Sequence, residues 1–298
     1  MRVAILGCGY VGLELGRQLT DAGHEAIGVR RSEDGLAAIE DAGFTAVQAD
    51  LLDADSLSAV PDVDALVYAA STGGRGADAA RRIYVAGMRT ALSHFSSRED
   101  PPDRLVYTSS TGVHGDHDGD WVTEETPLSP TTPKTEVLVA AEELALSAGE
   151  AFDIDGTVAR FSGLYGPDRY RLERYLEGPV TEGYLNMVHG EDAAGAVAYL
   201  LAEDLAPGAV VQVTDDEPVS KWTFADWLAE QCGVDEPPKQ TIEERLAGGD
   251  LSDAAERRLR TSKRVSNEKL RGLGYEFRYP TFREGYRQAV DLYRERHS

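Results

Sequence analysis

A glycine-rich turn stands between an apolar run and a helical pattern at the start of the chain. Residues 3–6 (VAIL) are uniformly apolar, residues 7–12 (GCGYVG) follow the pattern GxGxxG, and apolar residues recur at helical spacing over 13–19. The flanking strand and helix make the motif informative, because GxGxxG means little without them. The first glycine allows a tight turn, the second lets the backbone approach a pyrophosphate, and the third lets the helix pack closely on the strand. The sequence therefore predicts a strand–turn–helix unit that binds a dinucleotide.

The first turn of this helix supplies the groups that would hold the phosphates. Unpaired N–H groups and a partial positive charge gather at a helix N-terminus and attract anions. A tight turn without a ligand is the alternative, and the flanking strand and helix disfavour it. We predict five cofactor-binding residues in this unit: Gly7, Gly9, Tyr10, Val11 and Gly12.

Strand and helix patterns continue to alternate along the next 150 or so residues. Strand patterns occupy residues 25–29, 45–49, 65–69, 104–108 and 157–161. Helical patterns occupy residues 32–42, about 77–96 and 133–147. Ser32 and Thr132 suit the N-cap position, and Pro133 suits the first helical position. Strands that alternate with helices predict an α/β chain with the Rossmann fold, a doubly wound parallel sheet.

The pattern loosens beyond residue 166. Helices are expected at 192–201, 224–232 and 282–296, a strand is expected at 209–214, and the stretch 237–264 is charged and irregular. We predict a dinucleotide-binding core over residues 1–165, to which 186–214 return. Residues 166–185 and 215–298 are predicted to form a small C-terminal substrate lobe over the carboxyl ends of the strands, where ligands bind in open α/β sheets.

The chain is strongly acidic, with 52 acidic and 30 basic residues, a formal net charge of −22, and only five lysines. Such a surface repels nucleic acid and anionic membranes, so neither is expected as a partner. An acidic, lysine-poor composition resembles proteins of salt-loving cells, whose surfaces stay soluble when salt screens charge. An ordinary acidic protein is the alternative.

Other features place the chain among cytoplasmic proteins that hold no metal. No apolar run is long enough to span a membrane, the N-terminus already reads as a strand rather than a signal peptide, and two distant cysteines do not suggest a disulfide framework. Residues 114–120 hold two histidines and three aspartates. Trp121 and Pro127, however, stand at the positions where a calcium loop has its glycine and its distal glutamate. We therefore expect a hydrated acidic loop there.

The residues after the second strand bear on the choice of cofactor. Arg30, Arg31 and Ser32 stand where a carboxylate would favour NAD, and arginines suit the 2′-phosphate of NADP better. We expect NADP ahead of NAD, with surface salt bridges as the alternative role of the arginines. Asp50, which ends the third strand, would bind the adenine amino group or cap a turn. Ala69, which ends the fourth strand, is a further candidate.

Several later motifs resemble one family. They are residues 108–115 (TSSTGVHG), 160–167 (RFSGLYGP), 186–194 (NMVHGEDAA), and 264–267 (RVSN) followed by 273–275 (LGY). In their order and spacing the chain resembles the extended and atypical short-chain dehydrogenase/reductases of the NAD-dependent epimerase/dehydratase type. The resemblance implies a Rossmann core, a substrate lobe, and hydride transfer on a nucleotide sugar or another hydroxyl-bearing metabolite. A homodimer that forms through the fourth and fifth helices is common in such proteins.

The resemblance also implies that Ser110 corresponds to the family's catalytic serine, and Ser109 and Thr111 are the competing candidates for that role. A hydroxyl at the carboxyl end of this strand would hydrogen-bond a substrate carbonyl or alcohol. The alternative role of Ser110 is to satisfy the local backbone in a turn.

The family's catalytic tyrosine and lysine do not appear. Aligned with the family's helix, Lys134 stands at the tyrosine position and Leu138 at the lysine position, and no tyrosine occurs between Tyr107 and Tyr165. Lys134 and His114 are the candidate replacements for the proton donor, because both can exchange protons. A solvated lysine and a histidine stacked in a loop are the alternatives.

A basic cluster follows the Tyr-Gly-Pro segment. Arg169 and Arg171, with Arg174, are candidate ligands of a substrate phosphate, and ion pairs with Glu173 and Glu177 are the alternative. Two functions follow from these residues. The first is an NAD(P)-dependent oxidoreductase or epimerase that acts on a nucleotide sugar or related alcohol or carbonyl compound. The second is a non-catalytic NADP(H)-binding sensor or regulatory protein, which the missing tyrosine and lysine favour.

Overall fold

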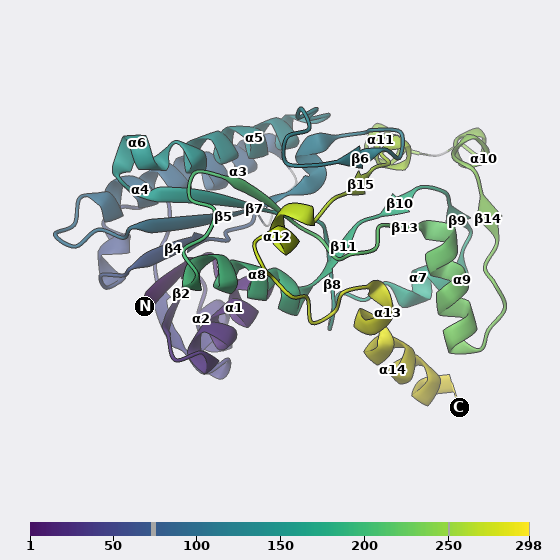
Figure 1. Cartoon of the computed structure of the whole chain (residues 1–298), viewed down its shortest axis with the longest axis horizontal. Coiled ribbons are helices and arrows are strands. Elements are labelled where there is room, and N and C mark those ends of the chain that lie inside the picture. Colours follow the sequence, from purple (N-terminus) through teal and green to yellow (C-terminus); the bar gives the residue numbers. More distant parts are fainter. Residues whose placement is uncertain (73–75, 250, 298) are drawn as a thin grey trace.

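Seven parallel strands form the central sheet of the computed structural model, which describes residues 1–72, 76–249 and 251–297 (Figure 1). The strands run in the order β3-β2-β1-β4-β5-β7-β12, and every neighbouring pair is parallel. Their bounds are β1 Arg2–Leu6, β2 Glu25–Arg30, β3 Thr45–Gln48, β4 Ala65–Tyr68, β5 Arg104–Ser110, β7 Asp155–Phe161 and β12 Val210–Val213. This order confirms the predicted Rossmann-type doubly wound α/β fold.

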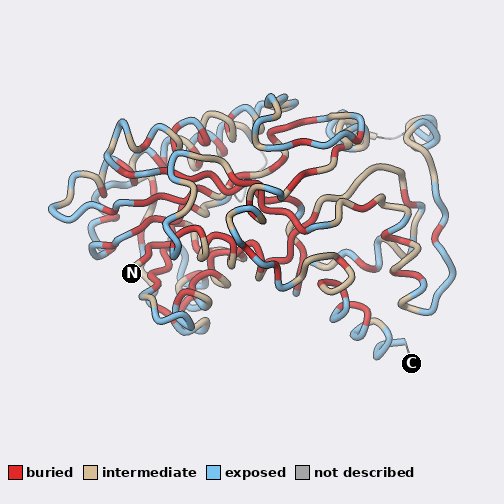
Figure 2. The backbone as a smooth tube through the Cα atoms, viewed as in Figure 1, coloured by how far each residue is buried: buried red, intermediate tan, exposed pale blue. Residues whose placement is uncertain are grey.

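Helices cover both faces of the sheet, and the buried residues lie between these layers (Figure 2). One face carries α1 (Tyr10–Asp21), α2 (Glu33–Asp41) and α8 (Gly190–Ala202). The other carries α3 (Ala77–Ala80), η2 (Arg81–Gly87), α4 (Met88–Ser96), α5 (Pro133–Leu146) and α6 (Ala148–Phe152). Strands covered on both sides must be apolar along their whole length, and β4 is buried at every position.

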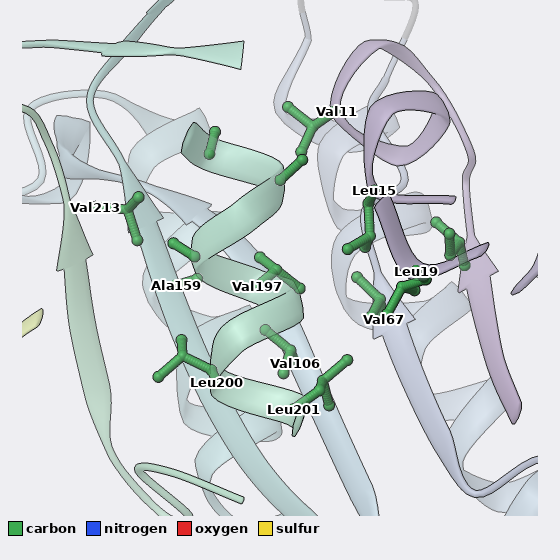
Figure 3. Close-up of a cluster of buried hydrophobic side chains, with 14 of the residues drawn as sticks. Val11, Leu15, Leu19, Val67, Val106, Ala159, Val197, Leu200, Leu201 and Val213 are labelled. Atoms are coloured by element: carbon green, nitrogen blue, oxygen red, sulfur yellow. The ribbon is translucent and has the colours of Figure 1, made fainter. Parts of the chain in front are cut away.

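Figure 3 shows how the first face is packed. Leu15 and Leu19 of α1 and Val197 and Leu200 of α8 lie over the sheet, and all four are at most 1% exposed. Each such side chain stabilises the fold by roughly 1.5–3 kcal/mol through its burial. The apolar spacing of the two helices therefore fixes their place on the sheet.

Local capping signals act where the sequence predicts them. The Ser32 side chain accepts a hydrogen bond from Gly35 N at the start of α2. Thr132 accepts one from Thr135 N at the start of α5, and Pro133 takes the first helical position. Both predicted N-caps are thus confirmed.

The helix expected over residues 77–96 differs from the prediction. Its middle, η2, is seven residues of π-helix between α3 and α4. The Tyr68 hydroxyl on β4 donates a hydrogen bond to the Ile83 carbonyl inside this segment. A side chain that takes a helix carbonyl loosens the regular ladder of backbone bonds, which accounts for the wider turn.

Most of the C-terminal elements lie beyond the carboxyl ends of the central strands (Figure 1). The short strands pair as β8 (Gly163–Tyr165) with β11 (Met187–His189), β9 (Val180–Thr181) with β14 (Lys239–Gln240), β10 (Tyr184–Leu185) with β13 (Val219–Ser220), and β6 (Trp121–Val122) with β15 (Arg264–Val265). The helices here are α7 (Leu172–Glu177), α9 (Lys221–Cys232), α10 (Ile242–Ala247), α11 (Asp253–Arg260), α12 (Glu268–Gly272), α13 (Phe282–Gly285) and α14 (Arg287–His297). Two 3-10 turns, η1 (Ser56–Ala59) and η3 (Thr111–His114), complete the chain's elements.

Two expectations for this part are corrected. Residues 237–264 are not irregular, because they contain β14, α10, α11 and the start of β15. The single helix expected over 282–296 is broken at Tyr286 into α13 and α14. Phe224, Phe282 and Tyr286 are nearly fully buried in a separate apolar cluster, so packing rather than local pattern sets this geometry.

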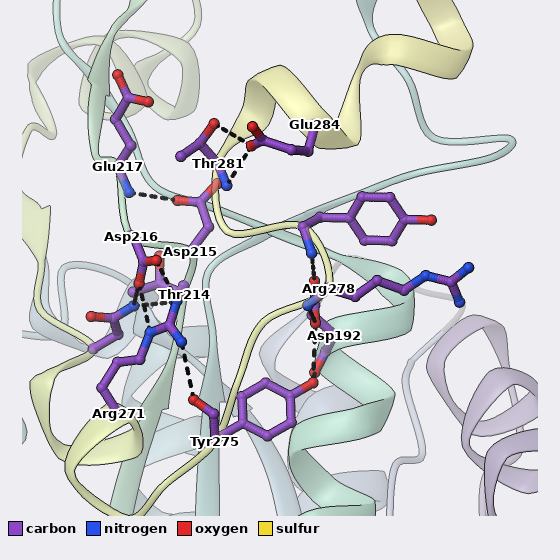
Figure 4. Close-up of polar contacts among 12 residues, drawn as sticks. Asp192, Thr214, Asp215, Asp216, Glu217, Arg271, Tyr275, Arg278, Thr281 and Glu284 are labelled. Atoms are coloured by element: carbon purple, nitrogen blue, oxygen red, sulfur yellow. Dashed lines mark hydrogen bonds and ion pairs between the residues drawn. The ribbon is translucent and has the colours of Figure 1, made fainter.

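Two carboxylates, the buried Asp192 and the exposed Asp216, fasten the C-terminal segment to the core (Figure 4). Asp192 on α8 accepts hydrogen bonds from Arg278 N and Tyr279 N, each at 2.8 Å, and from the Tyr275 hydroxyl at 3.1 Å. Asp216 accepts from the Arg271 guanidinium and from Asn267. These contacts tie residues far apart in the sequence to one end of the sheet.

Within the described part of the chain, no helix combines the length and apolar character needed to cross a membrane.

Candidate functional site

The glycine turn has the geometry that a bound phosphate requires. Gly7 has φ +89°, and a Cβ there would lie 2.2 Å from Ala70 Cα, so the position demands glycine. At Gly9 a Cβ would meet Arg30 Nη1 at 3.4 Å and otherwise only Gly7 O at 4.0 Å, so space remains beside the backbone. At Gly12 a Cβ would lie 3.0 Å from Ile5 Cγ2, which reflects the close packing of α1 on β1.

The N-terminus of α1 faces this space without a cap. The helix begins at Tyr10, and no side chain forms a capping hydrogen bond with it among the described residues. The N–H groups of its first turn and the positive end of the helix are therefore available to an anion. The turn and the helix together fit a pyrophosphate.

One cleft of about 610 Å³ brings most of the predicted site residues together. It lies at the carboxyl ends of β1, β4 and β5, where the strand order reverses. Its lining includes these predicted residues: Gly9, Tyr10, Val11, Gly12, Ala69, Ser110, Lys134, Arg169 and Arg171.

A smaller cavity of about 330 Å³ adjoins the cleft and shares Ala70 and Ser71 with it. The remaining cofactor candidates, Gly7, Arg30, Arg31 and Asp50, line this cavity. The two cavities together follow the path that a dinucleotide takes across such a sheet.

Three of these residues also form the local contacts that were the alternatives to cofactor binding. Arg30 Nη1 donates to the Cys8 carbonyl at 3.2 Å, and Arg31 Nη1 lies 3.5 Å from Asp50 Oδ2 in an exposed ion pair. Asp50 Oδ1 accepts from Leu52 N at 3.0 Å and so closes a turn. Exposed pairs of this kind contribute about 0–1 kcal/mol, so a phosphate would displace the Arg31 pair at little cost.

Ser110 is the hydroxyl best placed among the serines and threonines at the end of β5. The Ser109 hydroxyl donates to Glu142 at 2.6 Å, and the Thr108 hydroxyl donates to Tyr68 O at 3.3 Å. Ser110 Oγ accepts from Gly112 N at 3.1 Å, a contact that uses a lone pair and not the hydroxyl hydrogen. The hydrogen of Ser110 can therefore point to an oxygen in the cleft.

Helix α5 presents Lys134 and Leu138 to the cleft, one turn apart. The helix contains no tyrosine. A buried ion pair holds it in place, because Glu142 accepts from Arg160 of β7 at 2.7 Å and from Ser109 of β5. Lys134 is thus carried by a rigid element beside Ser110.

His114 lies apart from the other candidates. It is fully buried and does not line the cleft. Burial lowers the pKa of its imidazole to about 3, and the nearby Arg160 and Lys263 cations act in the same direction. Neither ring nitrogen has a hydrogen-bond partner among the described residues. This neutral, enclosed ring does not join Ser110 and Lys134 in the cleft.

Arg169 and Arg171 stand at the side of the cleft formed by the C-terminal elements. The Arg169 guanidinium lies over the Tyr10 ring, 4.3 Å from its centroid. Within the described ranges neither arginine forms an ion pair with Glu173 or Glu177.

A second large cavity, of about 890 Å³, was not foreseen from the sequence. Arg171 lines both this cavity and the cleft. Its cations are Arg171, Arg174, Lys221, Arg245 and Arg258. None of the described residues that line it is a carboxylate. Burial lowers the pKa of Lys221, Arg174 lowers it further, and Glu182 acts in the opposite direction.

In the described residues, no group of three or more His, Cys, Asp or Glu side chains is placed to hold a metal ion.

Comparison with known proteins identifies the family of this chain. The model of the NAD dependent epimerase/dehydratase family matches residues 3–212. The chain belongs to this family. Membership supports the use of NAD(P) and an enzyme-like function, and it accounts for the glycine turn and for the cleft above β1, β4 and β5.

Three relatives match nearly the whole chain. Protein YeeZ of Escherichia coli K12 is 30% identical and covers 94% of this chain and 96% of its own. A solved structure from Methylobacillus flagellatus, assigned as an NAD-dependent epimerase/dehydratase, is 30% identical, with a TM-score of 0.75 and coverage of 98% and 97%. UDP-glucose 4-epimerase of Thermotoga maritima, solved with UDP-glucose, shares the fold at a TM-score of 0.79, with 16% identity and full coverage of both chains.

Proposed function

We propose that this protein is an NAD(P)-dependent oxidoreductase or epimerase whose substrate is a nucleotide sugar or a related phosphorylated alcohol or carbonyl compound. The observation that carries the proposal is the basic cavity that shares its lining residue Arg171 with the cleft. In a chain with a net charge of −22, five cations around one cavity are concentrated against the overall composition.

Electrostatics favours a multiply charged anion in this cavity. Neighbouring cations repel one another, and a diphosphate would relieve that repulsion through charge-assisted hydrogen bonds. A diphosphate held by Arg174, Arg245 and Arg258 would leave its sugar pointing through Arg171 toward Ser110. UDP-glucose 4-epimerase shares the fold and was solved with UDP-glucose, which supports a nucleotide sugar as the ligand class.

The cofactor would lie across the glycine turn. The N–H groups of Tyr10, Val11 and Gly12 would hold its pyrophosphate, and the nicotinamide supplies or accepts a hydride when bound. We propose NADP as the preferred form, because Arg30 and Arg31 line the adjoining cavity and suit a 2′-phosphate.

The chain's own residues would orient the substrate and handle its proton. Ser110 would donate its hydroxyl hydrogen to the reacting oxygen, which stabilises developing negative charge. Lys134 would add a positive charge on the same side of the cleft. Leu138 and Phe161 line the cleft and limit the access of water.

The experiment compares two arginines of one helix. Arg258 lines the basic cavity, whereas Arg260 on the same helix pairs with Glu256 outside it. Arg258→Ala is expected to weaken binding of UDP-glucose or dTDP-glucose about tenfold or more, because it removes charge-assisted contacts worth about 1.5–3 kcal/mol. Arg260→Ala should leave binding unchanged. Equal effects of the two variants, measured by calorimetry, would contradict the assignment of the cavity.

The second candidate function, a sensor of NADP(H) without turnover, rests on one observation: α5 has no tyrosine. It predicts tight NADPH binding but no hydride transfer with any nucleotide sugar. A screen that follows nicotinamide absorbance with UDP- and dTDP-sugars separates the two functions.

A further inference from the structure

A tyrosine from another element lines the cleft beside Ser110 and Lys134. Tyr84 lies in η2, which packs against α5, and its side chain is 8% exposed. The sequence does not indicate that Tyr84 lines the cleft, because residues 77–96 have the pattern of a regular helix. The cleft therefore contains a phenol although α5 does not.

The local backbone that presents Tyr84 is unusual. The π-helix of η2 is a rare conformation that occurs frequently at functional sites. The Tyr68 hydroxyl donates a hydrogen bond to the carbonyl of Ile83, the residue before Tyr84. A Cβ at Gly87 would lie 2.6 Å from the same Tyr68 hydroxyl. The wide turn around Tyr84 is thus fixed by a buried contact from β4.

The Tyr84 hydroxyl is oriented by the loop that follows β4. Thr72 N donates to Tyr84 Oη at 3.4 Å. This contact uses a lone pair of the oxygen and not its hydrogen. Ala69, Ala70 and Ser71 of the same loop line the cleft together with Tyr84.

The other tyrosines of the cleft are less suited to exchange a proton. The Tyr10 hydroxyl donates to Tyr165 O, and burial raises the pKa of Tyr10. The Tyr165 hydroxyl packs directly against Gly285, and burial raises its pKa far above the usual value. Burial raises the pKa of Tyr286 to about 12.

We infer that Tyr84 exchanges the proton of the substrate oxygen, in place of the tyrosine that α5 lacks. The inference rests on the proposed function. When a carbonyl is reduced, a hydride from the nicotinamide bonds to its carbon and the Tyr84 hydroxyl gives its proton to the oxygen. An alcohol and a phenolate result, and water reprotonates the phenolate; oxidation runs in reverse. Ser110 donates a second hydrogen bond to the same oxygen.

Tyr84→Phe tests the role, because it removes one oxygen from a buried ring. With NADPH and a keto nucleotide sugar that the wild type reduces, kcat should fall about 100-fold or more. KM and the Kd of NADPH should stay within about twofold, since the lost interaction belongs to the transition state. Tyr293→Phe on α14, outside the cleft, is the matched control and should match the wild type.

A spectroscopic measurement provides a readout besides activity. In the complex with NADP⁺ and a keto nucleotide sugar labelled with carbon-13 at its carbonyl, the infrared carbonyl frequency reports hydrogen bonds to that oxygen. The wild type should lower the frequency relative to free ligand, and Tyr84→Phe should reverse much of that shift. Ser110→Ala should retain part of it, which tests for a second donor even if Tyr84→Phe does not fold.

The outcomes separate this inference from the proposed function. If the wild type reduces a keto nucleotide sugar and Tyr84→Phe keeps its kcat, or if Ser110→Ala loses the whole frequency shift, Tyr84 is not the donor and the proposed function stands. If the wild type binds neither NADPH nor a nucleotide sugar, both fail.

Discussion

Gly7 and Gly9 stand two residues apart in one turn, yet they must be glycine for different reasons. At Gly7 the backbone has φ +89° and a Cβ would collide with Ala70 Cα, so the folded chain itself requires glycine. At Gly9 φ is −103° and no atom lies closer to a Cβ than 3.4 Å, so the fold would tolerate a side chain. A ligand against the backbone, as we propose, would account for the second glycine.

Replacement of these two glycines should therefore have opposite effects. Gly9→Val should fold with a melting temperature close to that of the wild type and lose NADPH binding, because its side chain fills the phosphate space. Gly7→Ala should lower the melting temperature by several degrees, because the residue is strained and overlaps Ala70. Thermal unfolding and nicotinamide fluorescence measure both. Full NADPH binding by Gly9→Val would argue against the phosphate site.

At the scale of elements, a buried carboxylate stands where the chain leaves the last strand of the central sheet. Asp215, next to the end of β12, is 1% exposed, and its Oδ2 has no hydrogen-bond partner in the described chain. Its Oδ1 accepts from Glu217 N at 3.4 Å (Figure 4). Burial raises the pKa of Asp215 well above the usual value, because the charged form is poorly solvated there.

Asp215 should make stability fall as pH rises. The folded protein keeps a proton that the unfolded chain releases, so the contribution is complete below the unfolded pKa, about 3.9, and is lost as pH rises through the raised folded value. Asp215→Asn should be more stable than the wild type at neutral pH, and the difference should shrink toward acid pH. Thermal unfolding across a pH series measures this; parallel curves for the two proteins would show that Asp215 is not the cause.

The elements that the sequence predicts are those whose signals are local. Apolar strands, the N-caps Ser32 and Thr132, and the glycine turn can be recognised within a few residues, and they confirm the Rossmann core. The π-helix of η2 could not be foreseen, because it depends on a hydroxyl from β4, fifteen residues away. Strand β14 likewise exists by pairing with β9, about sixty residues earlier in the chain.

The residues of the candidate site also fall into two groups, those that local sequence signals predict and those that only tertiary contacts bring to the site. The phosphate turn follows β1, Ser110 ends β5, and Lys134 lies in the first turn of α5, so the order of elements already places them at one edge of the sheet. His114 does not line the cleft, and its complete burial could not be foreseen because burial is a tertiary property. Arg245, Arg258 and Tyr84 meet the cleft or the basic cavity only through the folding of distant segments.

For the whole molecule, the net charge affects how anionic ligands approach the protein. A net charge of −22 repels anionic ligands at long range, and five cations in one cavity oppose that repulsion locally. Concentrated salt shortens the screening length to about 3 Å at 1 M, which removes the long-range repulsion but preserves direct contacts. The predicted adaptation to salt and the cavity's proposed role in binding diphosphate are therefore compatible.

The central claim is that the glycine turn and its neighbouring arginines hold a dinucleotide. The most direct test is a titration of the purified protein, in high salt, with NADPH and with NADH, followed by nicotinamide fluorescence. The account predicts saturable binding of both, with NADPH bound about tenfold or more tightly through charge-assisted contacts of its 2′-phosphate. No binding of either by the folded protein would contradict it.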